Sequence, residues 1–254
     1  MSEVKFVEVM GFRVFSDDLS KISINQGSAK VINTISPNSY GLAVNDPKLD
    51  HALKNSDYLV LDGVYFAVAS LLLKGQNIKR NQGPDVFYHY MNRLEHSGGT
   101  AFFLGSSDHT LELIRRRAAR DYPGIKVHTY SPPFKSEFTE EDNQKMIDAV
   151  NKVSPDVLFI GMTCPKQERW SIQHREFLKA GLIVCIGNVF DWFAGTQKSI
   201  HPLWFKLRVG WLVRIILRPE IFRRNIGNQM KFFADTLKLF FSFRKDQPGT
   251  RVNI

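Results

Sequence analysis

The segment Asp156-Val-Leu-Phe-Ile160, followed by Gly161-Met-Thr-Cys-Pro165, decides the fold of this 254-residue chain. Its apolar run predicts a buried β-strand, the glycine predicts a tight turn, and the pattern from Lys166 to Leu178 predicts a helix. The same order of strand, glycine turn and helix recurs at two other places: Thr100–Leu104 with Gly105, and Leu182–Ile186 with Gly187. Strands that alternate with helices predict βαβ units and a parallel sheet.

Other segments extend this pattern toward both ends. Strands are predicted at Val31–Ile35, Tyr58–Leu61 and Lys126–Thr129, and helices at Pro47–Lys54, Tyr65–Lys74, Glu140–Lys152 and Val189–Ala194. Asp46 is expected to cap the first of these helices, with Pro47 at its first position. The nearly continuous apolar strands indicate burial on both faces of the sheet. We therefore predict an α/β fold, with a Rossmann-like parallel-sheet domain over residues 1–200.

The sequence changes character after Pro202. Aromatic and aliphatic residues recur there at helical spacing with basic residues between them, and Pro219 interrupts the pattern. This composition is typical of helices that lie at a membrane surface. Residues 201–245 are predicted to form a helical, basic, membrane-associating appendage, and residues 246–254 a flexible tail.

The net charge of +9 is concentrated in this appendage. Residues 201–245 contain ten Lys and Arg against two acidic residues, a difference of eight. Such asymmetry predicts a polyanionic partner: anionic lipid, a phosphate-bearing substrate or nucleic acid. Nucleic acid is the least favoured of the three, because the appendage is strongly apolar and no docking motif is recognisable.

The cysteine content, the N-terminal residues and the apolar stretches indicate the cellular compartment. Two cysteines, Cys164 and Cys185, do not make a disulfide framework and favour a reducing compartment. Met1–Met10 does not read as a secretory signal. The longest apolar stretch, Tyr58–Leu73, is interrupted by Asp62 and Gly63, so no membrane span is predicted. Contact with a membrane is expected from its surface.

Three glycines stand where a parallel sheet binds ligands. Gly105, Gly161 and Gly187 each follow a predicted strand, and ligands bind beyond the carboxyl ends of such strands, near the free N–H groups of helix N-termini. A nucleotide site is the functional interpretation. The alternative is that glycine simply suits the turn between a strand and a helix.

Asp62 and Thr34 also lie at strand ends. A carboxylate after the strand Tyr58–Leu61 suits a general base that deprotonates an acceptor hydroxyl. The alternative role for Asp62 is to cap the helix Tyr65–Lys74. The Thr34 hydroxyl is a candidate for binding phosphate or sugar, or else satisfies a turn near Pro37.

No metal site is predicted. The chain has neither an Asp-x-Asp pair nor closely spaced histidines. Leaving-group charge would then be met by backbone N–H groups, by Arg80 and by the C-terminal arginines. Cys164 lacks an evident base that would make it a nucleophile.

Several blocks resemble, in order and with similar gaps, the WecG/TagA/CpsF glycosyltransferase family between residues 30 and 240. They are Thr34-Ile-Ser-Pro-Asn-Ser-Tyr40, Ala52-Leu-Lys-Asn-Ser-Asp57, Leu61-Asp-Gly63, Gly161-Met-Thr-Cys-Pro-Lys-Gln-Glu-Arg-Trp170, Gly187-Asn-Val-Phe-Asp-Trp-Phe-Ala-Gly195, Gly210-Trp-Leu-Val-Arg214, Arg218-Pro219 and Arg223-Arg224-Asn225. One block alone would be weak evidence, but together they are specific.

The resemblance implies an inverting transfer from a UDP-sugar to a sugar on undecaprenyl diphosphate, with no cofactor and no essential metal. It implies that Asp62 is the general base and Thr34 an active-site residue. Substrate or nucleotide contacts are implied for the following residues: Asn38, Arg80, Gly161, Gln167, Gly187, Asn188 and Asp191. The position of Gly105 after a strand predicts the same kind of contact. Contacts to the diphosphate and the membrane are implied for Arg214, Arg218, Arg223 and Arg224.

One position departs from the family. Many relatives have Asn two residues after the threonine, where this chain has Ser36. Either Asn38 takes the place of that asparagine, or the contact with the acceptor differs from that in the relatives. This variant resembles capsule and exopolysaccharide members more than teichoic-acid members.

The expected location and partners follow from the resemblance. The enzyme would be peripheral on the cytoplasmic face of the cell membrane, with a UDP-sugar, a lipid-linked acceptor and the anionic membrane surface as partners. Association into a homo-oligomer and the identity of the donor sugar stay open. The rival function is a non-catalytic nucleotide-binding module with a basic tail that binds membrane or nucleic acid.

Overall fold

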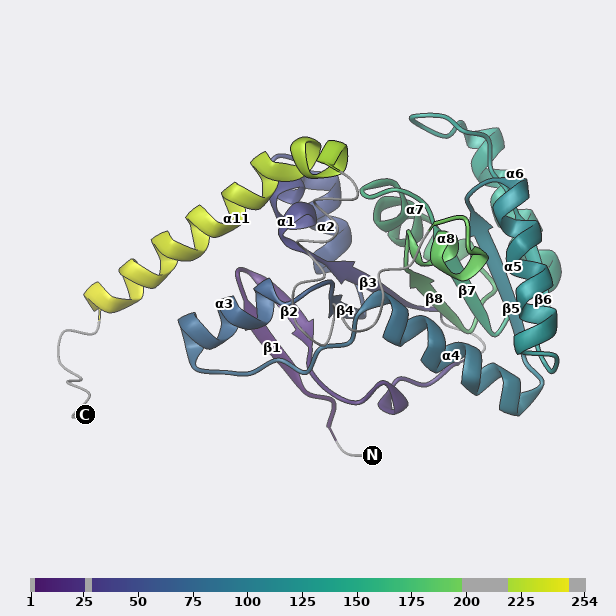
Figure 1. The fold of residues 1–254 in the computed structure, drawn as a ribbon, viewed down its shortest axis with the longest axis horizontal. Helices are drawn as coiled ribbons and strands as arrows, with labels where there is room; N and C mark the ends of the chain where they lie inside the picture. Colours follow the sequence, from purple (N-terminus) through teal and green to yellow (C-terminus); the bar gives the residue numbers. More distant parts are fainter. Residues whose placement is uncertain (1–2, 26–28, 198–218, 247–254) are drawn as a thin grey trace.

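Six parallel strands form the central sheet, in the order β4-β3-β8-β7-β5-β6 (Figure 1). The computed structural model describes residues 3–25, 29–197 and 219–246. The strands of the sheet are β3 (Lys30–Ile35), β4 (Tyr58–Leu61), β5 (Thr100–Gly105), β6 (Lys126–Tyr130), β7 (Val157–Gly161) and β8 (Leu182–Cys185). The predicted α/β fold with a parallel sheet is confirmed.

Helices connect the strands and cover both faces of the sheet. They are α1 (Pro37–Val44), α2 (Pro47–Lys54), α3 (Tyr65–Lys74), α4 (Gly83–Ser97), α5 (Asp108–Asp121), α6 (Glu140–Val153), α7 (Lys166–His174) and α8 (Val189–Ala194). The predicted cap of α2 is confirmed, because Asp46 accepts a hydrogen bond from the N–H of Leu49 at 3.1 Å. Helix α7 is shorter than predicted, because the 3-10 turn η2 (Arg175–Phe177) replaces its last residues.

The core explains why the inner strands β5 and β7 are almost entirely apolar. In β5, Phe103 packs with α4, α5 and α8, whereas its neighbours Phe102 and Leu104 pack on the opposite face with α6 and α7. In β7, Phe159 lies on the α4–α5–α8 side in the same way. Because consecutive side chains point to opposite faces, a strand that is covered on both sides needs apolar residues at every position.

A two-stranded hairpin lies outside the main sheet. Strands β1 (Phe6–Val9) and β2 (Phe12–Phe15) pair antiparallel, and a short 3-10 turn, η1 (Leu19–Lys21), follows. The hairpin shares a third core cluster with β4, α2 and α3. The sequence did not predict this hairpin, nor helices α1 and α4.

The C-terminal helix α11 (Pro219–Asp246) packs against α1 and α3 and then extends beyond them (Figure 1). Phe232 is buried and its ring centroid lies 4.7 Å from that of Phe66 in α3. The hydroxyl of Tyr40 in α1 donates to Asp235 Oδ2 at 2.9 Å. Burial of one such phenylalanine contributes roughly 1.5–3 kcal/mol. Residues 201–218 of the predicted appendage lie outside the described residues, and α11 accounts for the part from Pro219 onward.

No helix in the described parts of the chain combines the length and the apolar character that crossing a bilayer requires.

Candidate active site

Asp62 and Thr34 lie at the carboxyl ends of two neighbouring strands. Asp62 directly follows β4, and its backbone N–H donates to the carbonyl oxygen of Ile35 at 2.8 Å. Thr34 precedes Ile35 in β3 and lies opposite Val60 in the register of the two strands. The structure therefore brings the candidate base and the candidate threonine to one corner of the sheet.

The side chains of Asp62 and Thr34 have no protein partner within the described residues. Asp62 is exposed, and α3 begins after Val64 without any side-chain cap. Asp62 is therefore not the cap of that helix, which was the alternative. Thr34 is half-buried, and its hydroxyl makes no hydrogen bond in the same part of the chain. Both groups are available to a ligand.

The residues after Thr34 begin α1 and connect this corner to α11. Ser36 Oγ accepts from the N–H of Ser39 at 3.2 Å, and Ser39 Oγ accepts from the N–H of Ser36 at 2.8 Å. This reciprocal pair is a capping box. Asn38 Oδ1 accepts from the side-chain amide of Asn228 in α11 at 3.0 Å. Ser36 is thus engaged in a helix cap, and Asn38 contacts the C-terminal helix.

The turn after β8 lies close to the start of α4. Gly187 in this turn has φ +51°, a conformation that favours glycine. A Cβ atom on Gly83 would lie 3.4 Å from Cγ2 of Val189, so the two segments are in contact. Arg80 stands three residues before Gly83 and is exposed, and its guanidinium has no partner among the described residues. The segment that contains Arg80 therefore lies at the carboxyl-end edge of the sheet, where Gly187 is located.

Asn188 and Asp191 belong to a polar cluster around α8. The carboxylate of Asp191 accepts from Thr196 Oγ1 at 3.1 Å and from Gln197 Nε2 at 2.9 Å. The amide of Asn188, which is exposed, lies 2.8 Å from Gln197 Oε1. These contacts hold the segment after α8 against the turn after β8. The sequence did not single out Thr196 or Gln197, because neither belongs to a recognisable motif.

Packing explains why Gly105 and Gly161 are glycines. They lie opposite each other at the ends of β5 and β7. A Cβ on Gly105 would lie 2.5 Å from the carbonyl oxygen of Gly161, and a Cβ on Gly161 would lie 2.4 Å from the ring of Phe190. Either substitution would force the strands or α8 to move. The close approach supports the interpretation that these glycines serve the turns, and a role in ligand binding stays a prediction.

Gln167 is buried beneath the candidate site instead of lining an open surface. Its Oε1 accepts from the backbone N–H of Met162, after β7, at 3.3 Å. Its Nε2 donates to Glu168 Oε1 at 2.9 Å. The side chain also lies within van der Waals reach of the Gly187 position, 3.6 Å from a Cβ placed there. The Gln167 side chain is therefore fixed to the end of β7 and lies close to the turn after β8.

Glu168 completes this buried arrangement. It is 1% exposed, and its second carboxyl oxygen, Oε2, has no hydrogen-bond partner among the described residues. Burial raises the pKa of this carboxyl, because the charged form loses its hydration. Burial also raises the pKa of the neighbouring Cys164 thiol, and so disfavours the thiolate that a nucleophile requires.

We expect Glu168→Gln to be tolerated, and to stabilise the protein increasingly as the pH rises. In the unfolded chain Glu168 ionises near its ordinary pKa, whereas in the folded protein it keeps its proton to higher pH. Above the ordinary pKa of Glu, the free energy of unfolding of the parent therefore falls relative to that of the variant. The decrease is at most about 1.4 kcal/mol per pH unit. Urea unfolding of both proteins at pH of about 5 and about 8 measures this difference.

The matched control is Glu176→Gln, which changes an exposed carboxylate that pairs with Arg175 at 3.0 Å. Its effect on stability should be small at both pH values. A Glu168→Gln variant that is less stable than the parent at the higher pH would contradict a neutral Glu168.

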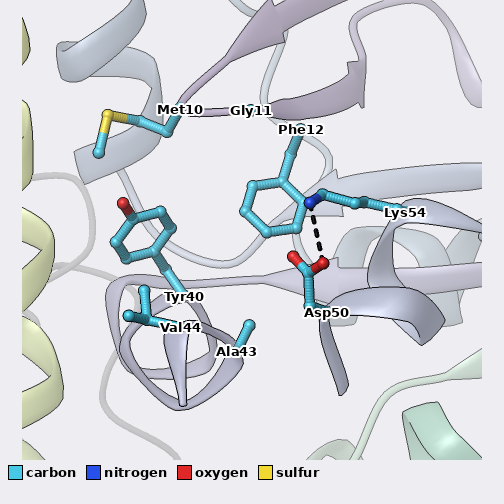
Figure 2. A pocket seen from close by; sticks show the side chains of 8 residues that line it. All are labelled: Met10, Gly11, Phe12, Tyr40, Ala43, Val44, Asp50 and Lys54. Carbon is cyan, nitrogen blue, oxygen red and sulfur yellow. Dashed lines mark hydrogen bonds and ion pairs between the residues drawn. The ribbon is translucent and has the colours of Figure 1, made fainter. Parts of the chain in front are cut away.

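None of the residues predicted for the site lines either of two cavities, although the larger cavity borders the turn after β7, at residues 163–166. Figure 2 shows a cavity of about 200 Å³ between the hairpin turn at Gly11 and helices α1 and α2, where Lys54 pairs with Asp50 at 2.8 Å. It is smaller than most ligand pockets, which span about 300–1,000 Å³. A larger cavity of about 870 Å³ lies between α2, α7 and residues 136–140.

The structure describes two of the four C-terminal arginines that were predicted to contact the diphosphate and the membrane. Arg223 and Arg224 are exposed in the first part of α11. Arg214 and Arg218 lie outside the described residues. Among the described residues no three His, Cys, Asp or Glu side chains converge as metal ligands. Independence from metal stays a prediction.

The sequence also contains a helix-start signal close to the candidate site, at the beginning of α4. Gln82-Gly-Pro-Asp85 has proline in the first turn and an acidic residue that accepts from the N–H of Gln82 at 2.9 Å, which are signs of a helix start. Recognising α4 would have placed Arg80 at the edge where ligands bind, because α4 runs back from that edge to the amino end of β5.

These features define an α/β enzyme whose candidate active site lies beyond the carboxyl ends of the strands. The chain belongs to the WecG/TagA/CpsF family of glycosyl transferases, whose family model matches residues 7–246. It is therefore a glycosyltransferase, as the family blocks in the sequence implied.

Curated relatives are similar over most of the chain. An N-acetylglucosaminyldiphosphoundecaprenol N-acetyl-β-D-mannosaminyltransferase of Bacillus spizizenii is 24% identical over 213 residues, which cover 84% of this chain and 81% of that protein. The enzyme of the same description from Bacillus subtilis is 25% identical over the same shares. That of Staphylococcus aureus is 22% identical over 187 residues, with 73% of this chain and 71% of that protein covered.

Proposed function

We propose that this glycosyltransferase moves a hexose from a UDP-sugar to a sugar carried on undecaprenyl diphosphate, with inversion at the transferred anomeric carbon. The observation that carries the proposal is the carboxylate of Asp62, which is exposed at the carboxyl end of β4 and has no partner among the described residues, while the backbone N–H of Asp62 is bonded to β3. The names of the relatives describe an acceptor with N-acetylglucosamine on diphosphoundecaprenol and a β-linked product. An acceptor of the same class is the simplest expectation here.

The proposed reaction is a single displacement. An acceptor hydroxyl attacks the anomeric carbon on the face opposite the nucleotide, and the bond from that carbon to the diphosphate oxygen breaks. The Asp62 carboxylate takes the proton of the attacking hydroxyl, and UDP leaves with the bonding electron pair. The Thr34 hydroxyl, on the neighbouring strand β3, orients the acceptor or the sugar by hydrogen bonding.

Stabilisation of the leaving diphosphate needs positive charge or N–H donors. Arg80 is suited to this role, because it is exposed near the turn after β8 and its guanidinium is unpaired within the described residues. Arg223 and Arg224 of α11 are further candidates, with Arg214 and Arg218 in the preceding segment. With these cations, the reaction is proposed to need no metal ion.

The lipid-linked acceptor places the reaction at a membrane surface. Helix α11 packs on α1 and α3, and it carries basic and apolar side chains. Each Lys or Arg near an anionic surface contributes about 1 kcal/mol to binding. We propose a peripheral enzyme on the cytoplasmic face of the membrane that acts in exopolysaccharide or capsule synthesis, as the sequence Thr34-Ile-Ser-Pro favours over teichoic-acid synthesis.

A donor screen tests this proposal. The purified protein is incubated with individual UDP-sugars and a water-soluble, short-chain lipid-diphosphate-N-acetylglucosamine, and UDP release is measured with and without a chelator. We expect acceptor-dependent turnover with one donor and no effect of the chelator. Loss of turnover in chelator would overturn the metal-free part alone, whereas nucleotide binding without turnover for any donor would favour the non-catalytic module.

A further inference from the structure

Helix α11 exposes a stripe of large apolar side chains. Ile226, Met230, Phe233, Leu237 and Phe241 recur at helical spacing, and they are between 36% and 60% exposed. The helix buries a different side, on which Phe232 and Thr236 face α1 and α3. Basic residues lie beside the stripe on the other flank: Arg223, Arg224, Lys231 and Lys238. The helix thus has a buried, an exposed apolar and a basic side.

Helix α3 exposes an apolar surface of its own. Val68 is 48% exposed, Leu71 57% and Leu72 55%, whereas Phe66 and Ala69 on the opposite side are buried. Lys74 is the one charged residue of this helix. Exposed aliphatic side chains that are grouped in this way mark an interaction surface more often than single ones do.

The apolar surfaces of α3 and α11 adjoin each other. The ring of Tyr65, at the start of α3, meets that of Phe233 at 5.3 Å between centroids. Val68 and Leu72 lie on the same side of the helix as Tyr65, because they follow it by three and seven residues. The apolar stripe of α11 therefore continues onto α3, with which α11 is in contact.

The charges beside this surface favour an anionic bilayer over a second copy of the chain. A symmetric dimer would bring the two sets of basic residues, Arg223, Arg224 and Lys238, toward each other. The nearby acidic residue on α11, Asp235, already pairs with Lys231 at 2.6 Å and accepts from Tyr40. Anionic headgroups supply the missing negative charge, and acyl chains cover the apolar side chains.

We infer that the catalytic domain itself contacts the bilayer through α3, with Val68, Leu71 and Leu72 inserted beside the stripe of α11. This inference rests on the proposed function and assigns a membrane contact to a part of the chain outside the basic appendage. Because Asp62 stands three residues before α3, such contact would hold the candidate base close to the membrane surface, where a lipid-linked acceptor presents its sugar.

The test is the double variant Leu71→Gln, Leu72→Gln in the full chain. Both side chains are exposed, so folding should be preserved, and UDP affinity and the unfolding temperature verify this. We expect co-flotation with vesicles of phosphatidylglycerol and phosphatidylethanolamine to fall by about tenfold. Turnover of long-chain acceptor in the same vesicles should fall in parallel, while turnover of the water-soluble acceptor stays within about twofold of the parent. The matched control, Phe177→Gln, changes another exposed apolar residue (64%), located in η2, and should alter none of these.

The outcomes separate the inference from the proposed function. Flotation of the double variant equal to that of the parent would overturn the role of α3, and so would a parent that does not bind these vesicles. Loss of a dimer in size-exclusion chromatography without a change in flotation would assign the surface to a second copy and also overturn it. Absence of turnover with the water-soluble acceptor in the parent would instead refute the proposed function, whatever the flotation shows.

Discussion

Asp62→Asn is expected to lower kcat by about 10²–10⁴-fold and to leave the affinity for UDP nearly unchanged. The amide has a similar shape but cannot accept the proton of the acceptor hydroxyl. Because the Asp62 side chain has no protein partner within the described residues, the substitution should not destabilise the fold. Steady-state kinetics with the water-soluble acceptor, together with calorimetric titration of UDP, separates the two effects.

Asp148→Asn is the matched control, because Asp148 is an exposed carboxylate on α6, where it accepts from Gln144 at 2.8 Å. Its kcat should equal that of the parent. An Asp62→Asn enzyme that retains most of its turnover would show that another group takes the proton, and the assignment of Asp62 as general base would have to be withdrawn.

Gly41→Ala is expected to loosen α11 from α1. A Cβ on Gly41 would lie 2.4 Å from both Cα and the carbonyl oxygen of Asn228, so one of the two helices must move. Overpacking of this kind costs about 1–3 kcal/mol. The free energy of unfolding in urea should fall by this amount, and proteases should cleave near α11 faster than in the parent. Turnover of membrane-bound acceptor should fall as well.

Gly227→Ala provides the comparison within α11 itself. A Cβ there has no atom within 4 Å, and alanine favours a helix over glycine by up to about 1 kcal/mol. This variant should be as stable as the parent or more so. If Gly41→Ala behaved like Gly227→Ala, the close packing of α1 on α11 would not contribute to stability.

The sequence alone predicted the segments in which strands alternate regularly with helices. Each predicted strand of the sheet is present. Inner strands carry continuous apolar runs such as Val157–Ile160, whereas the outer strand β6 is partly polar and partly exposed. The hairpin β1–β2 was not predicted, although two short apolar runs, each with one charged residue, flank the turn at Gly11, which is a hairpin pattern. Helix α1 was missed because Ser36 and Pro37 were interpreted as a turn, although serine as N-cap followed by proline also begins a helix.

The candidate site was predictable in its residue types but not in its contacts. The position of Asp62 after an apolar strand was enough to suggest a base at the sheet edge. Sequence spacing could not show that Gln167 is buried beneath the turn after β8, or that Asn38 meets Asn228, 190 positions away. Such contacts depend on tertiary packing, which local patterns do not encode.

The hairpin also affects which edge of the sheet could pair with a strand of a second molecule. Strand β4 is an outer strand of the sheet, and β1 and β2 pack over it with Phe12 and Val14 in the core they share. The opposite outer strand, β6, retains a free row of amide and carbonyl groups within the described part of the chain, and it begins with the exposed Lys126. Lysine on an open edge discourages strand exchange between molecules. Within the central sheet, pairing between molecules would therefore start at β6, at the end most distant in strand order from β4.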